Sequence, residues 1–211
     1  MVSPLFYVRP GDESFVPQVS HPGEDAGADI CAHVTDTYDR DDAIDFYREF
    51  ESASLRHGTR LYVDGEVFTS ESENEFLDVL DQCGGAVLLG PGCTELVNSG
   101  FKVILPNLKN LSFPWNSLVS VYKIVPRSGL SNKHGILVTN SPGIIDSGYR
   151  GWVKVSLTNS RDNYHVFTHG SRIAQGLCEM VFDQSGNKST TNENVFEVTG
   201  RSTGGFGSTG V

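Results

Sequence analysis

A turn that follows an apolar strand carries the first residues suited to chemistry. In "PRSGLSNKHG" (126–135), Arg127, Ser128 and Gly129 come directly after a run rich in β-branched residues. Backbone N–H groups at such a turn, with a small hydroxyl and a guanidinium, can hold phosphate oxygens. A Pro-Arg-Ser-Gly sequence can equally be only a turn, so alone it does not establish an anion site.

The stretch "TNSPGIIDSGYRG" (139–151) offers a carboxylate, an amide and an aromatic ring. Asp146 follows two isoleucines at the expected end of a buried strand, where it is either a turn cap or a general base. The amide of Asn140 both donates and accepts hydrogen bonds, as reading the edge of a nucleobase requires. Tyr149 could place a flat ring against a sugar.

Two further features suit a nucleotide. Gln175 lies in "RIAQGLCEMVF" (172–182), a strand otherwise fit for burial, so its amide needs partners in a structural network or in a ligand. The chain ends on "GRSTGGFGSTGV" (200–211), which is too rich in glycine to hold one conformation by itself. This tail is either a frayed end or a segment ordered by a ligand, with Phe206 stacked on a base and Arg201 near phosphates.

Length and composition limit the class of protein. A chain of 211 residues predicts one domain that can bury its own core. The four cysteines show no C-x-x-C spacing, which gives no zinc or disulfide pattern and favours reduced thiols in the cytoplasm. The N-terminal sequence does not resemble a signal peptide, and no apolar stretch approaches the ~20 residues that span a bilayer.

The negative charge is confined to one segment. The chain has a net charge of −10, which argues against a general nucleic-acid-binding protein. Residues 36–81 contain 14 Asp and Glu and 4 Arg, a net of −10, so the remaining 12 acidic and 12 basic residues cancel.

Outside this segment the sequence predicts short strands. Residues 117–125, 151–159 and 172–182 are rich in β-branched and aromatic residues and are bounded by Gly, Pro, Asn or Ser. Residues 88–105 predict three strands separated by a Pro-Gly turn and a Ser-Gly turn. These patterns predict an all-β barrel or sandwich.

Residues 34–86 predict an α+β insertion in this β domain. A helical pattern over 41–58 stops at Gly58, and a second over 70–85 ends at Gly84-Gly85. Between them, Asp64-Gly65 separates two short apolar runs and predicts a hairpin. The apolar residues expected to form a small satellite core are Ile44, Phe46, Phe50, Leu61, Val63, Phe76, Leu77 and Leu80.

Five motifs, in their order along the chain, resemble those of the trimeric dUTP pyrophosphatases, the dUTPases. The motifs are "AGADI" (26–30), "PRSGL" (126–130), "GIIDSGYRG" (143–151), "RIAQ" (172–175) and "RSTGGFGSTG" (201–210). The resemblance covers roughly residues 15–33 and 87–211. It implies a single domain over 1–211 that folds as a jelly-roll-like β-barrel and forms a homotrimer with three active sites at subunit interfaces. It also implies Mg²⁺-dependent hydrolysis of dUTP to dUMP and pyrophosphate, which limits uracil in DNA and supplies dUMP for dTTP synthesis.

The resemblance assigns roles on the phosphate side of the site. Asp146 matches the carboxylate that activates the water attacking the α-phosphorus. Asp29 matches a carboxylate that acts on Mg²⁺ through bound water. The residues that match phosphate-side positions are Arg127, Ser128, Gly129 and Gln175.

The resemblance also assigns the nucleoside side. Asn140 and the main chain of 140–145, with Gly143 and Ile145, match a hairpin that reads uracil and excludes the methyl group of thymine. Tyr149 matches a tyrosine that packs on the deoxyribose. The tail (200–211) matches a lid that closes over the nucleotide, usually on a neighbouring subunit's site. The tail residues assigned to the substrate are Arg201, Phe206, Gly207, Ser208 and Thr209.

Three features, two single residues and one pair, depart from the family pattern. Gly148 replaces a second acid, and Trp152 stands where a small or polar residue is commoner. We expect both to change local support rather than chemistry. Glu24-Asp25 replaces a Gly-Ser pair, so the resemblance does not predict how water is arranged around Mg²⁺.

Two alternatives to a dUTPase have distinct signatures. A dCTP deaminase shares the fold but needs a glutamate at the position of Ser156. A regulatory protein with this fold would bind a protein partner through the insertion, and an extra lobe of this kind suggests a phage or viral source and the host cytoplasm. Because ten net negative charges repel a triphosphate, we expect the insertion to project away from the phosphate end of the site.

Overall fold

The computed structural model describes residues 4–34, 38–69 and 72–185, which are mostly short strands joined by turns. The strands are β1 (Leu5–Val8), β2 (Ala28–Cys31), β3 (Leu61–Val63), β4 (Glu66–Val67), β5 (Ala86–Leu89), β6 (Thr94–Asn98), β7 (Phe101–Ile104), β8 (Leu118–Val125), β9 (Ile136–Val138), β10 (Gly143–Asp146), β11 (Lys154–Asn159), β12 (Tyr164–Thr168) and β13 (Arg172–Phe182). The helices are α1 (Arg40–His57) and α2 (Glu73–Cys83), with short helical segments η1 (Glu13–Phe15), η2 (Trp115–Ser117) and η3 (Leu130–His134).

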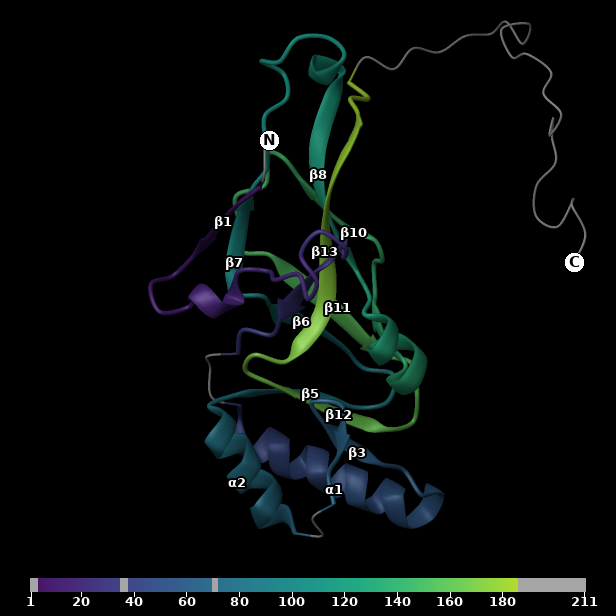
Figure 1. The fold of residues 1–211 in the computed structure, drawn as a ribbon. Helices are drawn as coiled ribbons and strands as arrows, with labels where there is room; N and C mark the ends of the chain where they lie inside the picture. The colour runs from purple at the N-terminus through teal and green to yellow at the C-terminus, as the bar shows by residue number, and fades with distance from the viewer. Residues whose placement is uncertain (1–3, 35–37, 70–71, 186–211) are drawn as a thin grey trace, which may run out of the picture.

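Four sheets enclose one large apolar cluster, here called the barrel core. Their strand orders are β10-β8-β13-β2, β6-β11-β9, β4-β3-β12-β5 and the pair β1-β7. Phe101 of β7, Leu157 of β11 and Phe167 of β12 are almost wholly buried in the barrel core, so strands from different sheets meet there. The strands predicted at 117–125, 151–159 and 172–182 are confirmed by β8, β11 and β13. The all-β prediction is therefore confirmed (Figure 1).

Both predicted helices of the acidic segment are present, with capping groups at their ends. The side chain of Asp39 accepts hydrogen bonds from two backbone N–H groups of the first turn of α1, and Ser72 does the same once for α2. Gly58 and Gly84 end the two helices with φ of 66° and 69°, a conformation that favours glycine. Local sequence signals thus determine where these helices begin and end.

The hairpin of the acidic segment joins the β domain directly. Asp64 and Gly65 form its turn with φ of 51° and 90°, as the Asp-Gly sequence predicts. On its other side β3 pairs in parallel with β12, from Tyr164 opposite Leu61 to Val166 opposite Val63. The hairpin therefore extends the β12-β5 pair into a four-stranded sheet.

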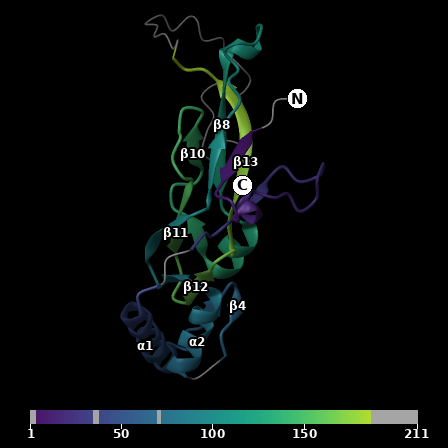
Figure 2. The same ribbon diagram turned by 90° about the vertical axis from the view of Figure 1, so that its left-hand side faces the viewer.

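Strand β12 is buried along its whole length because both of its faces are covered. Tyr164 and Val166 point to a second cluster, here called the insertion core, where they meet Tyr47, Phe76 and Leu80 of the helices. Phe167 faces the barrel core. Figures 1 and 2 both place α1 and α2 against the β12 sheet, at the end of the molecule opposite the loop that precedes β8. The helices form a layer of the domain rather than a loose appendage.

A buried histidine on β12 links stability to pH. His165 is 1% exposed, its ring stacks on Tyr62 at 5.0 Å, and its Nε2 has no hydrogen-bond partner in the described part of the chain. Burial, followed by the nearby His134, lowers the pKa of His165 to about 4. The unfolded imidazole has a pKa near 6.5, so the unfolded state binds the proton first as pH falls. The contribution of neutral His165 to the free energy of unfolding is therefore complete above pH ~6.5 and is lost as pH falls toward about 4.

We expect the free energy of unfolding to be lower at pH 5 than at pH 7.5, with His165 contributing about 2 kcal/mol of the difference. His165→Phe should reduce the pH dependence, and the exposed His57→Phe serves as the control. Urea unfolding at the two pH values measures this. Equal losses in the wild type and His165→Phe would exclude His165 as the source.

Candidate functional site

The first cluster of predicted site residues gathers where β2, β8 and β13 lie side by side. Gln175 of β13 pairs with Asp29 of β2 on one side and with Val125 of β8 on the other. Two residues beyond Val125, Arg127 reaches back to Asp29, with its Nε 3.0 Å from Oδ1. The structure therefore brings together three residues that lie in three separate motifs.

Arg172 completes this cluster and was not among the predicted site residues. Its Nη1 lies 3.4 Å from Oδ2 of Asp29, and its carbonyl oxygen accepts a hydrogen bond from Nη1 of Arg127 at 3.3 Å. The Asp29 side chain is 11% exposed and is paired with two guanidinium groups. The sequence did contain a signal, since Arg172 opens the quoted "RIAQ" motif three residues before Gln175.

Ser128 and Gly129 lie on the exposed turn between β8 and η3. The carbonyl oxygens of Arg127 and Ser128 both accept hydrogen bonds from the Ser131 hydroxyl, which fixes the turn. Gly129 has φ of −62°, open to any residue, and an added Cβ there would meet nothing within 4 Å. The fold of this protomer does not require glycine at 129, so the position leaves room for a ligand or another chain.

The second cluster lies on the segment that runs from β9, in the β11 sheet, to β10, in the β8 sheet, here called the β9–β10 segment. The backbone of Thr139 donates to Ser156 of β11 at 2.9 Å, which holds the start of this segment on its neighbour. A Cβ on Gly143 would lie 3.5 Å from the amide of Asn140, an ordinary van der Waals distance, so the two residues are neighbours in space. The side chain of Ile145 packs on the barrel core.

Asp146 ends β10 with an exposed side chain, and the expectation of a buried strand before it is wrong. β10 is an edge strand that pairs only with β8 within the described chain, and Ile144 is 47% exposed as a result. The backbone oxygen of Asp146 accepts the turn hydrogen bond from Tyr149, at 3.0 Å. Its carboxylate makes no hydrogen bond to the described residues, so it does not serve as the turn cap.

Tyr149 is held beside Asp146 by its own loop. Its hydroxyl donates to the carbonyl oxygen of Trp152 at 2.9 Å, and a Cβ on Gly151 would lie 2.6 Å from its Cζ. Gly151 is therefore needed for this ring position. Trp152 in turn lies under the cations of Arg9 and Lys102, at 5.2 and 5.0 Å, which gives this departure from the family pattern a structural role.

Of the other departures, Asp25 has a local explanation and Gly148 has none in the structure. Asp25 closes the turn before β2, because its carboxylate accepts from the backbone N–H of His21 at 2.9 Å. An added Cβ on Gly148 would meet nothing within 4 Å, so the fold around Gly148 does not require glycine.

The two clusters do not meet within one protomer. Asp146 pairs with Val121 and Gln175 with Val125, so they lie four residues apart along β8, on opposite neighbours of that strand. Sheet geometry places their Cα atoms roughly 13 Å apart along the strands and roughly 10 Å apart across them. The same register puts both side chains on one face of the sheet. The two clusters are therefore separate on this face of the sheet.

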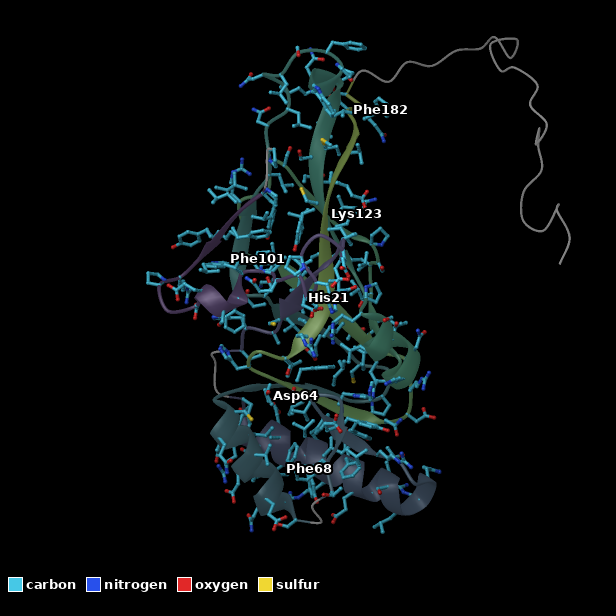
Figure 3. All side chains as sticks on the ribbon, in the orientation of Figure 1. His21, Asp64, Phe68, Phe101, Lys123 and Phe182 are labelled. Atoms are coloured by element: carbon cyan, nitrogen blue, oxygen red, sulfur yellow. The ribbon has the colours of Figure 1, made fainter. Side chains whose placement is uncertain are left out.

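A pocket of about 420 Å³ opens beside the first cluster, and the acidic insertion contributes to it. Arg127 and Arg172 line this pocket together with Asp64, from the turn of the insertion hairpin. The expectation that the insertion projects away from this end is therefore wrong for the hairpin, because β3 is fixed to β12 and carries its turn there. Figure 3 shows Asp64 at the junction of the two cores, above Phe68.

The predicted lid residues lie outside the described part of the chain. They are Arg201, Phe206, Gly207, Ser208 and Thr209. Within the described ranges, no group of three or more His, Cys, Asp or Glu side chains is placed to hold a metal ion. No helix described there is long and apolar enough to cross a membrane.

Comparison with known proteins identifies a set of relatives. A family model described as dUTPase matches residues 108–210. Proteins named deoxyuridine 5'-triphosphate nucleotidohydrolase include one from Roseobacter denitrificans, 40% identical over 134 residues (63% of this chain and 78% of the relative). Another, from Wolbachia pipientis, is 39% identical over 164 residues (76% of this chain and 94% of the relative).

Solved structures give the same fold. A Staphylococcus bacteriophage 80alpha dUTPase variant bound to dUpNHpp aligns with a TM-score of 0.58 at 17% identity, covering 99% of both chains. A dUTPase variant from phage phi11 of S. aureus, solved with a structural Mg(II) ion, aligns with a TM-score of 0.52 at 15% identity, covering 90% of this chain and 99% of that one. At these identities the structures establish the β fold that the sequence predicts.

Proposed function

This chain belongs to the dUTPase family, and we propose that it hydrolyses dUTP to dUMP and pyrophosphate through a water molecule activated by Asp146. The observation that supports these residues most directly is their placement. Residues from three of the motifs gather around Asp29, and those of "GIIDSGYRG" form β10 and the loop after it, directly beyond Asn140. It is a nucleotide hydrolase of the dUTP diphosphatase class.

We propose that each active site combines clusters from different subunits of a homotrimer. The separation of Asp146 from Gln175 supports this, because groups that act on one triphosphate would otherwise be spread over roughly 16 Å between Cα atoms of a single chain. The open space at Gly129 also suits an approaching chain or ligand. One subunit then supplies the β9–β10 segment with Asp146, and another supplies the arginines around Asp29.

The β9–β10 segment would bind the nucleoside. The amide of Asn140 and the main chain of 140–145 pair with the edge of uracil. The ring of Tyr149 packs on the deoxyribose. Asp146, whose carboxylate makes no hydrogen bond to the described residues, removes a proton from the water that attacks the α-phosphorus, and pyrophosphate leaves.

The first cluster, around Asp29, would hold the phosphates. Arg127, Ser128 and Gln175 supply donors, and Arg172 adds a second guanidinium. A triphosphate carries about four negative charges, so positioning and charge neutralisation account for most of the catalysis. The cluster combines both, because Asp29 fixes the orientation of the two arginines.

A divalent cation, which we propose is Mg²⁺, fits this cluster only through water. Both oxygens of Asp29 already accept from arginines, but a carboxylate has about four lone-pair sites, which leaves two for bound water. With no acidic or histidine cluster among the described residues, the substrate's phosphates must supply most of the ligands. When bound, Mg²⁺ neutralises charge on the phosphate oxygens.

The test is a substrate panel of dUTP, dCTP, dTTP and UTP, each with Mg²⁺, followed by detection of pyrophosphate. Only dUTP should be hydrolysed at a substantial rate, and EDTA should abolish the reaction. Ammonia release from dCTP would instead indicate a deaminase, although Ser156 stands where that reaction needs a glutamate. No turnover of dUTP would overturn the proposal.

Deletion of residues 200–211 should remove most of the dUTPase activity and leave thermal stability almost unchanged. The reason is compositional, since a glycine-rich segment adds little to a core but Phe206 and Arg201 suit a lid over a nucleotide. Steady-state kinetics and a melting curve measure the two effects, and deletion of Val211 alone is the control. Normal hydrolysis by the truncated enzyme would rule out the lid.

A further inference from the structure

We infer that Asp64, on the acidic insertion, is a positioning residue that holds Arg172 beside Asp29. These two residues belong to the first cluster, with Arg127 and Gln175, which is called the phosphate cluster below. The inference rests on the proposed function and names a residue outside all five family motifs. It is carried by the hydrogen bonds of one carboxylate to the turn that leads into Arg172.

Both oxygens of Asp64 bind the turn between β12 and β13. Oδ1 accepts from the backbone N–H of Thr168 at 2.9 Å and from the hydroxyl of Ser171. Oδ2 accepts from the hydroxyl of Thr168 at 2.5 Å. The backbone N–H of Asp64 also donates to Val166 of β12, at 2.9 Å. One insertion residue thus holds both ends of the turn.

The turn leads directly to the arginine. Ser171 is followed by Arg172, the first residue of β13, and the carbonyl oxygen of Ser171 accepts from the backbone of Ala32 at 2.7 Å. The register of β13 against β2 is irregular between Arg172 and Ala174, so a local bulge separates Arg172 from the regular pairing of β13. Asp64 adds side-chain hydrogen bonds to the backbone hydrogen bonds that Gly170 and Ser171 make with Ala32.

Arg172 then acts at two places in the cluster. Its guanidinium pairs with Asp29 at 3.4 Å, and its carbonyl oxygen accepts from Arg127 at 3.3 Å. A shift of the turn would therefore move both cations that line the pocket of about 420 Å³. Asp64 borders the same pocket, yet both its oxygens are taken up by the turn.

The alternative is that Asp64 only forms its own hairpin. An aspartate before glycine suits a φ of 51°, and that explains the residue type. It does not explain why the carboxylate binds another turn, about a hundred residues away along the chain. Asparagine tolerates the same backbone conformation, so Asp64→Asn keeps the hairpin and removes only one acceptor oxygen.

The experiment compares Asp64→Asn, Asp64→Ala and Ser171→Ala with the wild-type enzyme. We measure kcat and KM for dUTP, and the affinities for dUpNHpp and dUMP by calorimetry. Asp64→Ala should lower kcat/KM about tenfold, with smaller losses for the other two. The affinity for dUpNHpp should fall and that for dUMP should stay close to wild type, because Arg172 serves the phosphate chain. Glu66→Gln, on the same hairpin, is the matched control and should behave as wild type.

A double-mutant cycle tests the route through Arg172. In the Arg172→Ala background, Asp64→Ala should cost little further activity. Additive losses, or equal losses of dUMP and dUpNHpp affinity, would overturn the inference, as would normal kinetics for Asp64→Ala. If Asp64→Ala does not fold, Asp64→Asn and Ser171→Ala decide by the same criteria. Absence of dUTP hydrolysis in the wild type would instead overturn the proposed function.

Discussion

Replacing Asp146 by Asn is expected to lower kcat for dUTP by at least ~100-fold, the usual effect of losing a general base. The substitution keeps the shape of the side chain and removes its ability to accept a proton. Because the turn at Asp146 is closed by its backbone oxygen, the change should leave the fold and subunit assembly intact. The affinity for dUpNHpp should also remain, since the assigned binding groups are elsewhere.

Single-turnover kinetics with dUTP measure this loss, and size-exclusion chromatography checks the assembly. Asp162→Asn, at an exposed aspartate in another loop, is the control for removing one negative charge. A near-normal kcat for Asp146→Asn would remove Asp146 from the mechanism. A normal oligomer with weak dUpNHpp binding would assign it to substrate binding instead.

Replacing residues 38–84 by a short Gly-Ser linker is expected to prevent stable folding. The helices cover Tyr164 and Val166 of β12, which are 7% and 0% exposed. Uncovering these two side chains costs about 3–6 kcal/mol, a large part of the 5–15 kcal/mol that stabilises a typical domain. Loss of β3 also leaves β12 with an unpaired edge.

Expression in soluble form, followed by urea unfolding, measures this effect. A graded version uses Phe76→Ala, which should lower the free energy of unfolding by about 3–5 kcal/mol because its side chain is fully buried. Leu55→Ala, at an 86% exposed position of α1, is the matched control. If the protein without residues 38–84 kept normal stability and normal kcat/KM, the insertion would be peripheral.

The sequence predicted those elements whose signals are local. The helix stops at Gly58 and Gly84 and the Asp64-Gly65 turn act within a few residues of themselves. Helix ends and the hairpin could therefore be identified before any tertiary contact was known. The strands β8, β11 and β13 followed from alternation and flanking turn residues.

What the sequence could not predict depends on pairing between distant strands. Nothing near Leu61 indicates that β3 lies parallel to β12, about a hundred residues later. The insertion was expected to stand apart from the phosphate end because of its charge, and the pairing that places Asp64 there was not foreseen. The exposure of Ile144 also depends on which strands lack a neighbour, a property of the whole sheet.

The candidate site was predicted to a similar extent. The motifs identified Asp29, Arg127 and Gln175, which the structure brings together. Arg172 was omitted although it opens the "RIAQ" motif, and its pairing with Asp29 becomes visible only once β2 and β13 lie side by side. The roles of these residues in catalysis remain predictions that the substitutions described here test.

A strand buried on both faces also bears on how the molecule opens. Because β12 contributes Val166 to the insertion core and Phe167 to the barrel core, neither core can come apart without exposing the other. The two cores are thus expected to unfold as one cooperative unit, with amide hydrogens of β12 exchanging only on global unfolding. A change in the packing of the insertion helices would therefore also affect β12, the strand that leads into the phosphate cluster.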